Sequence, residues 1–160
     1  MALEYTLEIA TDLTVREVVK YFAQRMGFHI TEEGSAYRGY TQLTAFRDTV
    51  EENLDADIIL LGNVEITHVI LRVASQAAPE ESHRAALDMI RAALAFFHDR
   101  PDDGALLLHN GERIILQRLK GQPVTFDNAW KEYAADFPDD PELDRIQGNH
   151  LVTMLPQPYL

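Results

Sequence analysis

Residues 3–19 read LEYTLEIATDLTVREVV, and this stretch passes from a strand pattern directly into the start of a helix. Apolar and polar side chains alternate from Leu3 to Ile9, which is typical of a strand with one face on a core and the other in water. Thr14 and Glu17 have the spacing of a capping box, in which each side chain binds the backbone N–H of the other residue. The sequence therefore predicts a strand followed at once by a helix.

Two amphipathic helices are predicted from apolar residues that recur at the helical period. The first begins at Val15 and ends at Gly27, because glycine readily takes the left-handed conformation that closes a helix. Its apolar stripe consists of Val15, Val18, Val19, Phe22, Ala23 and Met26. The second runs from Pro79, which suits a first helical turn, to Phe97. Its stripe consists of Ala86, Met89, Ile90, Ala93, Leu94 and Phe97.

Between these helices, short apolar runs separated by turn residues predict strands. Residues 28–31 and 37–46 flank a Glu-Gly-Ser turn, and Gly39 suggests a β-bulge in the second strand. Strands are also predicted at 58–61 and 64–73, on either side of Gly62-Asn63, a pair that suits a type II′ hairpin. That hairpin register would place His68 opposite Asp57, as a cross-strand charge pair.

A further hairpin is predicted around Asn110-Gly111, the pair most typical of a two-residue hairpin turn. With a two-residue loop, Leu107 faces Ile114 and Leu106 faces Ile115. Apolar residues at three successive positions, 106 to 108, indicate a hairpin covered on both faces and therefore central in its sheet. After it, Asp127 can cap a short helix that has Trp130, Tyr133 and Phe137 on one side.

The order of these elements predicts an α+β fold, with the two main helices packed on one face of a mostly antiparallel sheet. We expect one domain over residues 1–160, since no internal repeat or linker is visible and the chain is long enough to bury a core. Residues 138–160 show no clear period and are expected to form a docked or partly mobile tail.

Composition narrows the classes of partner. A formal net charge of −12 opposes binding to a phosphate backbone, which depends on Lys and Arg, so no nucleic-acid partner is expected. No apolar run approaches the length of a membrane span, so no membrane partner is expected. Glu4 and Glu8 interrupt the apolar run that a signal peptide requires, and cysteine is absent, which together predict a cytoplasmic protein.

Motifs for catalysis and cofactor binding are missing from the sequence. No two histidines lie three or four residues apart, and no serine lies in a Gly-x-Ser-x-Gly turn. Neither a G-x-G-x-x-G nor a P-loop pattern is present. The sequence therefore predicts a protein that is not an enzyme and that has no cofactor and no metal site.

Two acidic segments contain the candidate partner-binding residues. No Lys or Arg lies between the first and the last acidic residue of either segment. The first comprises Asp48, Glu51, Glu52, Asp55 and Asp57, and the second comprises Glu132, Asp136, Asp139, Asp140, Glu142 and Asp144, interleaved with Trp130, Tyr133 and Phe137. The candidate contacts are all five residues of the first segment and, from the second, Trp130, Asp136, Asp139 and Asp140. Aromatic anchors surrounded by charge are typical of protein-binding hot spots. Two structural interpretations stay open: each segment is a solvated face, and the aromatic residues dock their own helix to the core.

The opening residues MALEYTLEIATDL and the helix that follows to Met26 resemble the start of the Sit-type immunity proteins. These small bacterial proteins protect a cell against polymorphic toxins delivered by contact. The likeness continues through 69–73, the helix 79–97 and the Asn110-Gly111 hairpin, whereas 58–63 corresponds to an insertion. The resemblance implies an α+β cytoplasmic protein that performs no catalysis and blocks a cognate toxin by binding it.

Acidic surface would suit such a role, because many of these toxins attack nucleic acid through basic surfaces that attract an acidic inhibitor. Two other functions stay open. One is a small enzyme or metabolite-binding protein with a pocket between sheet and helices. The other is a structural or regulatory subunit that self-associates through a sheet edge.

Overall fold

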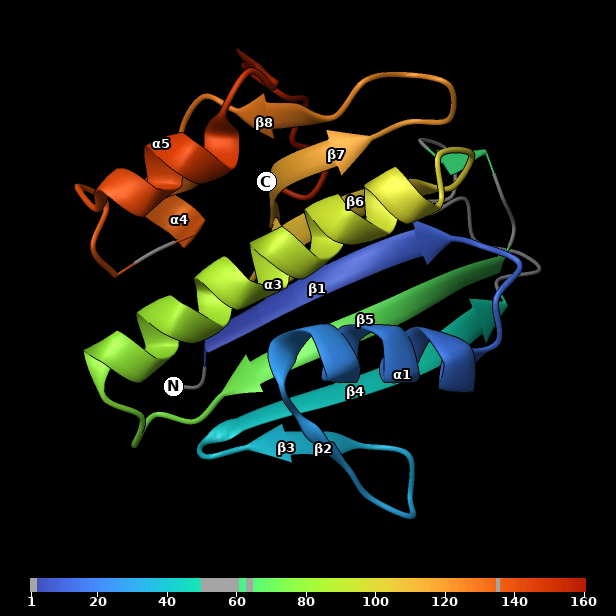
Figure 1. Ribbon diagram of the computed structural model, residues 1–160. Helices are drawn as coiled ribbons and strands as arrows, with labels where there is room; N and C mark the ends of the chain where they lie inside the picture. The colour runs from blue at the N-terminus through green and yellow to red at the C-terminus, as the bar shows by residue number, and fades with distance from the viewer. Residues whose placement is uncertain (1–2, 50–60, 63–64, 135) are drawn as a thin grey trace.

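Strand β1 (Leu3–Ala10) lies at the centre of the sheet that organises the molecule (Figure 1). The computed structural model describes residues 3–49, 61–62, 65–134 and 136–160. These residues form one sheet with the strand order β2-β3-β4-β5-β1-β6-β7-β8-β9. All neighbouring strands are antiparallel except β8 and β9, which are parallel. The mostly antiparallel α+β fold expected from the sequence is confirmed.

The other elements have the following bounds. The strands are β2 (His29–Ile30), β3 (Ala36–Arg38), β4 (Thr41–Thr49), β5 (Glu65–Val73), β6 (Gly104–His109), β7 (Arg113–Arg118), β8 (Thr125–Asp127) and β9 (Leu151–Thr153). The helices are α1 (Val15–Met26), α3 (Pro79–Asp99), α4 (Trp130–Ala134) and α5 (Pro141–Gln147).

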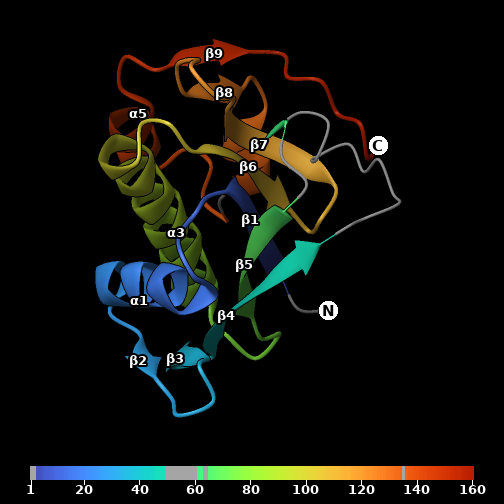
Figure 2. The ribbon, with the colours of Figure 1, turned by 90° about the vertical axis from the view of Figure 1, so that its right-hand side faces the viewer.

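Helices α1 and α3 cover the same face of the sheet, as Figures 1 and 2 show from two directions. Leu7 of β1, Phe22 of α1 and Phe96 of α3 are fully buried in the core between them. The two phenyl rings stack with their centroids 5.6 Å apart. The apolar stripes predicted for both helices are therefore the surfaces that bury the core. Beside the core, a hollow of about 640 Å³ lies between α1, β2 and β4, with a lining that includes Val19, Ile30 and Ala45.

Helix α1 starts and ends as its sequence predicts. The Thr14 side chain accepts from the Glu17 N–H, and the Glu17 side chain accepts from the Thr14 N–H, both at 3.1 Å. Gly27 closes the helix with φ 73°, in the left-handed region. The capping box and the terminal glycine are confirmed.

The polar face of β1 is not in water, contrary to the expectation from its alternation. Thr6 and Glu8 are buried, because side chains beside them on this face, among them Leu108 and Leu106 of β6, cover them. Glu4, at the start of the strand, stays partly exposed. On the face away from α1 and α3, a second, smaller core forms around Leu106, Leu108 and Leu155. A strand in the middle of a sheet can be covered on both faces even when its sequence alternates.

The hairpin predicted across Gly62-Asn63 is wrong, because both sides of β5 are already paired with β1 and β4. His68 lies opposite Glu8 and Phe46 rather than Asp57. Residues 58–60, 63 and 64 lie outside the described residues, and Leu61 is helical rather than extended. The turn residues suggested a local partner, whereas β5 takes two partners distant in sequence.

Two other details of strand pairing differ from the prediction. Gly39, with φ 57°, lies in a turn that divides the predicted strand 37–46 into β3 and β4, so it is not a bulge. At the Asn110-Gly111 hairpin both φ values are positive, but His109 pairs with Arg113 and Leu108 with Ile114. The predicted register was wrong by one residue next to the turn, because the loop has three residues. It was wrong by two residues at the predicted pairs, since Leu107 lies opposite Leu116 and Leu106 opposite Gln117. A bulge follows between Leu107 and Leu108, and the predicted central position of the hairpin strand β6 is confirmed.

The C-terminal segment contains regular structure that its sequence did not indicate. Residues 138–160 include α5, which begins after an Asp140 cap, and β9, which pairs with β8 through the register Phe126 to Val152. A three-residue edge strand has too few side chains to show a period. This pairing extends the sheet by one parallel strand.

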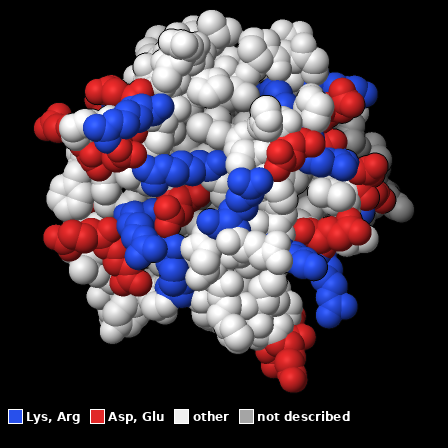
Figure 3. Space-filling view, viewed as in Figure 1, with Lys and Arg blue, Asp and Glu red and all other residues white. Residues whose placement is uncertain are grey.

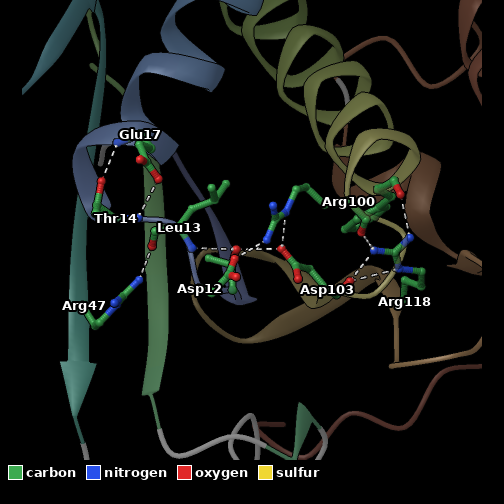
Figure 4. A network of polar contacts seen from close by, with 10 residues as sticks. Asp12, Leu13, Thr14, Glu17, Arg47, Arg100, Asp103 and Arg118 are labelled. Atoms are coloured by element: carbon green, nitrogen blue, oxygen red, sulfur yellow. Dashed lines mark hydrogen bonds and ion pairs between the residues drawn. The ribbon is translucent and has the colours of Figure 1, made fainter.

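The C-terminal end of α3 is held by a buried arginine from β7 (Figure 4). The Arg118 guanidinium donates to the carbonyl oxygens of Phe97, at 2.7 Å, and of Arg100 and Asp103. Helix C-termini leave carbonyl groups without intrahelical partners, and Arg118 satisfies them here. Asp12 extends this network to the β1–α1 connection through its ion pair with Arg100.

We expect the substitution Arg118→Ala to lower the free energy of unfolding by about 1–3 kcal/mol, because buried carbonyl groups would lose their donor. Arg16→Ala is the matched control, since Arg16 is exposed on α1 and has no ion pair with a described residue. Urea denaturation of both variants measures the difference. Equal stability of the two variants would contradict a capping role for Arg118.

Candidate functional site

The first acidic segment is represented by a single described residue. Asp48 lies in β4, so this strand continues beyond residue 46, where the sequence predicted its end. Its carboxylate is half exposed and its Oδ2 lies 3.9 Å from Nε2 of His68, whose Nδ1 is 3.5 Å from Oε1 of Glu8. Glu51, Glu52, Asp55 and Asp57 lie outside the described residues. Phe46 stacks on the His68 ring, with the centroids 4.6 Å apart.

The second acidic segment is folded around basic side chains from other elements. Asp140 caps α5 through the Glu142 N–H, at 3.0 Å, and its other oxygen lies 2.8 Å from Nε2 of His83 on α3. Nδ1 of His83 accepts from the Phe137 N–H at 3.4 Å, so Nε2 carries the hydrogen that is donated to Asp140. His83 therefore fixes the connection between α4 and α5 against α3.

Further ion pairs neutralise the carboxylates of α5. Glu142 pairs with Arg91 of α3 at 2.7 Å and with Arg145, and Asp144 pairs with Lys131 of α4. These pairs could not be predicted from the sequence, because Arg91 and Lys131 precede the acidic segment and lie in two different helices. On the helix-bearing face, acidic and basic side chains lie next to one another rather than in separate patches (Figure 3).

Asp136 and Asp139 remain exposed, and neither forms an ion pair with a described residue. Asp136 lies close enough to the buried Tyr5 to affect it: burial raises the pKa of the Tyr5 hydroxyl, and the negative charge of Asp136 raises it further. Together with the capped Asp140, these residues form the exposed acidic part of the α4–α5 connection. We call Asp136, Asp139 and Asp140 the α4–α5 acidic group.

Trp130 belongs to the core rather than to the surface. Its side chain is 1% exposed, its indole N–H donates to Oε1 of Gln147 at 2.9 Å, and its ring lies 4.7 Å from that of Phe126. Phe137, from the same predicted stripe, is 42% exposed. Of the two interpretations left open for these aromatic residues, docking of the helix to the core describes Trp130.

We expect Trp130→Ala to lower the free energy of unfolding by about 3–5 kcal/mol, as for other large core side chains. Phe137→Ala should cost much less, because much of that ring is already in water. Thermal and urea denaturation compare the two variants. A similar loss for both would contradict the different burial of the two rings.

The side chain of Asp127 connects several segments of the C-terminal region by hydrogen bonds. It is fully buried and accepts hydrogen bonds from the N–H groups of Leu155, at 3.0 Å, and Ala129, at 3.1 Å, and from Arg113 at 3.0 Å. Burial by itself would raise the pKa of Asp127, but these hydrogen bonds and the charge of Arg113 outweigh it and lower the pKa. The carboxylate thus joins β7, α4 and the chain after β9.

The lowered pKa of Asp127 implies that folding is stabilised by its ionised form. This contribution is complete above the unfolded-state pKa of about 3.9 and is lost as the pH falls through the folded-state pKa. We expect Asp127→Asn to be less stable at neutral pH and to lose stability less steeply below about pH 4. Urea denaturation over this range tests the expectation, with the exposed Asp139→Asn as control; parallel pH profiles of wild type and Asp127→Asn would contradict it.

Two hollows lie at the end of the sheet where β1 begins, and the sequence analysis did not identify either. The Tyr40 hollow, of about 390 Å³, is lined by residues that include Tyr37, Tyr40, Gln42, Arg72 and Ser75. The Glu112 hollow, of about 630 Å³, is lined by residues that include Glu4, His109, Asn110, Glu112 and Tyr133. Only the pairing of strands distant in sequence brings these residues together. Burial lowers the pKa of His109, although the nearby Glu112 opposes that shift.

The His, Asp and Glu side chains in the described part of the chain include no group of three placed to hold a metal ion. None of the helices there combines the length and the apolar composition needed to cross a bilayer.

Comparison with known proteins identifies the family. The SitI3-like family model matches residues 3–136, which extend from β1 to the residues just beyond α4. The curated proteins and the solved structures contain no match to this chain. Because the matched region is most of the 160-residue sequence, the chain belongs to the SitI3-like family, and this membership suggests an immunity protein.

Proposed function

We propose that this protein binds a cognate toxin and neutralises it by protein–protein contact, without making or breaking a covalent bond. The observation that carries the proposal is the family match over residues 3–136. The partner is a toxin whose toxic domain is basic, as in domains that cleave nucleic acid. In this proposal the protein acts in the cytoplasm and contacts neither nucleic acid nor membrane directly.

The carboxylates of Asp48 and of the α4–α5 acidic group, of which Asp136 and Asp139 are exposed, supply the charge in this proposal. Glu51, Glu52, Asp55 and Asp57 of the first segment add to it. Charge of one sign speeds the encounter with a partner of opposite charge by about 10 to 10³-fold. Fast association matters for an inhibitor that must act before the toxin finds its substrate. Trp130 contributes indirectly, since its buried ring holds α4 against the core.

Preorganisation supports the α4–α5 acidic group as a contact. His83 and the Glu142 N–H fix the Asp140 carboxylate, and Asp136 and Asp139 flank it in the same connection. A contact loop that is already ordered has less conformational entropy to lose on binding. Asp136 and Asp139 are then available to pair with cationic groups of the toxin.

We expect the toxin encoded beside this chain's gene to form a complex with the protein and to lose its toxicity when the two are co-expressed. The association rate should fall at least about tenfold when the salt concentration rises from about 0.05 M to about 0.5 M, because salt screens steering. Stopped-flow or biolayer interferometry measures this rate. Asp136→Asn with Asp139→Asn should slow association, whereas Glu32→Gln with Glu33→Gln, in the turn after β2, should not.

Two outcomes would contradict the proposal. Absence of a complex and of protection with the adjacent toxin would remove the proposed function altogether. Protection with an association rate that is independent of salt would leave an immunity function but remove the acidic-surface mechanism.

A further inference from the structure

We propose that the toxin docks on the helix-free face of the sheet, at the end where β1 begins, and inserts a cationic side chain into the Glu112 hollow and an apolar one into the Tyr40 hollow. This inference rests on the proposed function and adds a docking surface to the contact proposed for the α4–α5 acidic group. We call Tyr37, Tyr40, Gln42, Arg72, Glu4 and Glu112 the Arg72 surface.

A cross-strand row forms the floor of this surface. Gln42 of β4 lies opposite Tyr37 of β3 on one side and Arg72 of β5 on the other, and Arg72 lies opposite Glu4 of β1. The Gln42 amide donates to the Tyr37 hydroxyl at 2.9 Å, and Arg72 donates to the Glu4 carboxylate at 2.8 Å. Their neighbours Leu43, Leu71 and Tyr5 are in the core beneath α1 and α3, so this row points away from the helices.

The row separates the two hollows, since Arg72 lines one and Glu4 lines the other. Tyr37 is 45% exposed and Tyr40 is 56% exposed, although tyrosine rings are usually covered more fully. Tyrosine and arginine are the residue types that, with tryptophan, dominate protein-binding hot spots. An apolar side chain of the partner would cover both rings in the Tyr40 hollow.

The charge of the Glu112 hollow decides which partner group fits it. Glu112 is exposed and has no ion pair with a described residue, and Glu4 contributes a second carboxylate that Arg72 shares. Among the described residues that line this hollow, Arg113 is the one Lys or Arg, and it already has partners within the protein. It pairs with the buried Asp127 at 3.0 Å and lies 4.4 Å from the Tyr133 ring centre. A lysine or arginine of the toxin is therefore the complementary occupant.

Backbone contacts hold the surface in place before any partner arrives. The Tyr40 N–H donates to Glu81 of α3 at 3.0 Å, and the Tyr40 carbonyl accepts from Ala74 at 3.0 Å. The Glu4 N–H donates to the Asn110 side chain at 2.9 Å, and the Glu4 carbonyl accepts from the Asn110 N–H at 2.7 Å. Both turns that border the surface are thus tied to neighbouring elements, which lowers the entropy lost on docking.

Two single substitutions test the docking surface by biolayer interferometry against the toxin polypeptide encoded beside this chain's gene. We expect Glu112→Lys and Tyr40→Ala each to weaken binding at least about tenfold. Glu33→Lys is the control for Glu112→Lys, because both glutamates are exposed beside a turn glycine and lack an ion pair with described residues. Leu151→Ala is the control for Tyr40→Ala, because Leu151 is 55% exposed in the edge strand β9.

The outcomes separate this inference from the proposed function. Weakened binding by both surface variants, with controls like wild type and all melting temperatures unchanged, supports the Arg72 surface. If wild type binds and protects but the surface variants match their controls, the docking surface lies elsewhere while the immunity function stands. If wild type does not bind, the inference falls with the proposed function.

Discussion

The pairing of β1 with two strands at once is the constraint on which the rest of the structure depends. Residues 3–9 pair with β5 on one side, and residues 5–10 pair with β6 on the other. Every backbone hydrogen-bonding group of a buried strand needs a partner, so β1 can be central only when both neighbours are complete. This places segments around residues 70 and 107 beside the first residues of the chain, and both hydrophobic cores form on the sheet that results.

Helix α3 is held in position at three places by polar contacts with other elements. Arg118 satisfies the carbonyl groups at its C-terminal end, His83 connects its first half to the α4–α5 connection, and Glu81 fixes the turn before β4. The buried Asp127 does the equivalent for the C-terminal region, which otherwise has only short elements. Polar contacts at the ends of elements, added to the apolar core, therefore fix the positions of the surfaces that we propose for toxin binding.

The number of acidic residues along the sequence does not show how much negative charge remains at a surface, because folding brings basic side chains next to some of the carboxylates. Along the sequence, the acidic positions near residue 140 form a run that contains no basic residue. In space, Arg91 and Lys131 neutralise part of this run, and His83 hydrogen-bonds to Asp140. What remains unpaired among the described residues is a smaller set, including Asp136 and Asp139 near α5 and Glu112 at the hairpin. An acidic composition favours association with a cationic partner, but the contacts that hold the partner need carboxylates without an internal cation.

The sequence by itself determined the local elements: the strand and capping box of residues 3–19, both amphipathic helices, the chain reversal at Asn110-Gly111 and the α+β class. These follow from periodicity and from turn and cap preferences, which act over a few residues. Only the tertiary structure decided which strands pair, that Glu8 and Trp130 are buried, and that Glu4, Arg72 and Tyr37 lie in one row. Pairing between strands that are distant along the chain depends on the burial of whole faces of the sheet. The local pattern of one strand does not identify the strand with which it pairs.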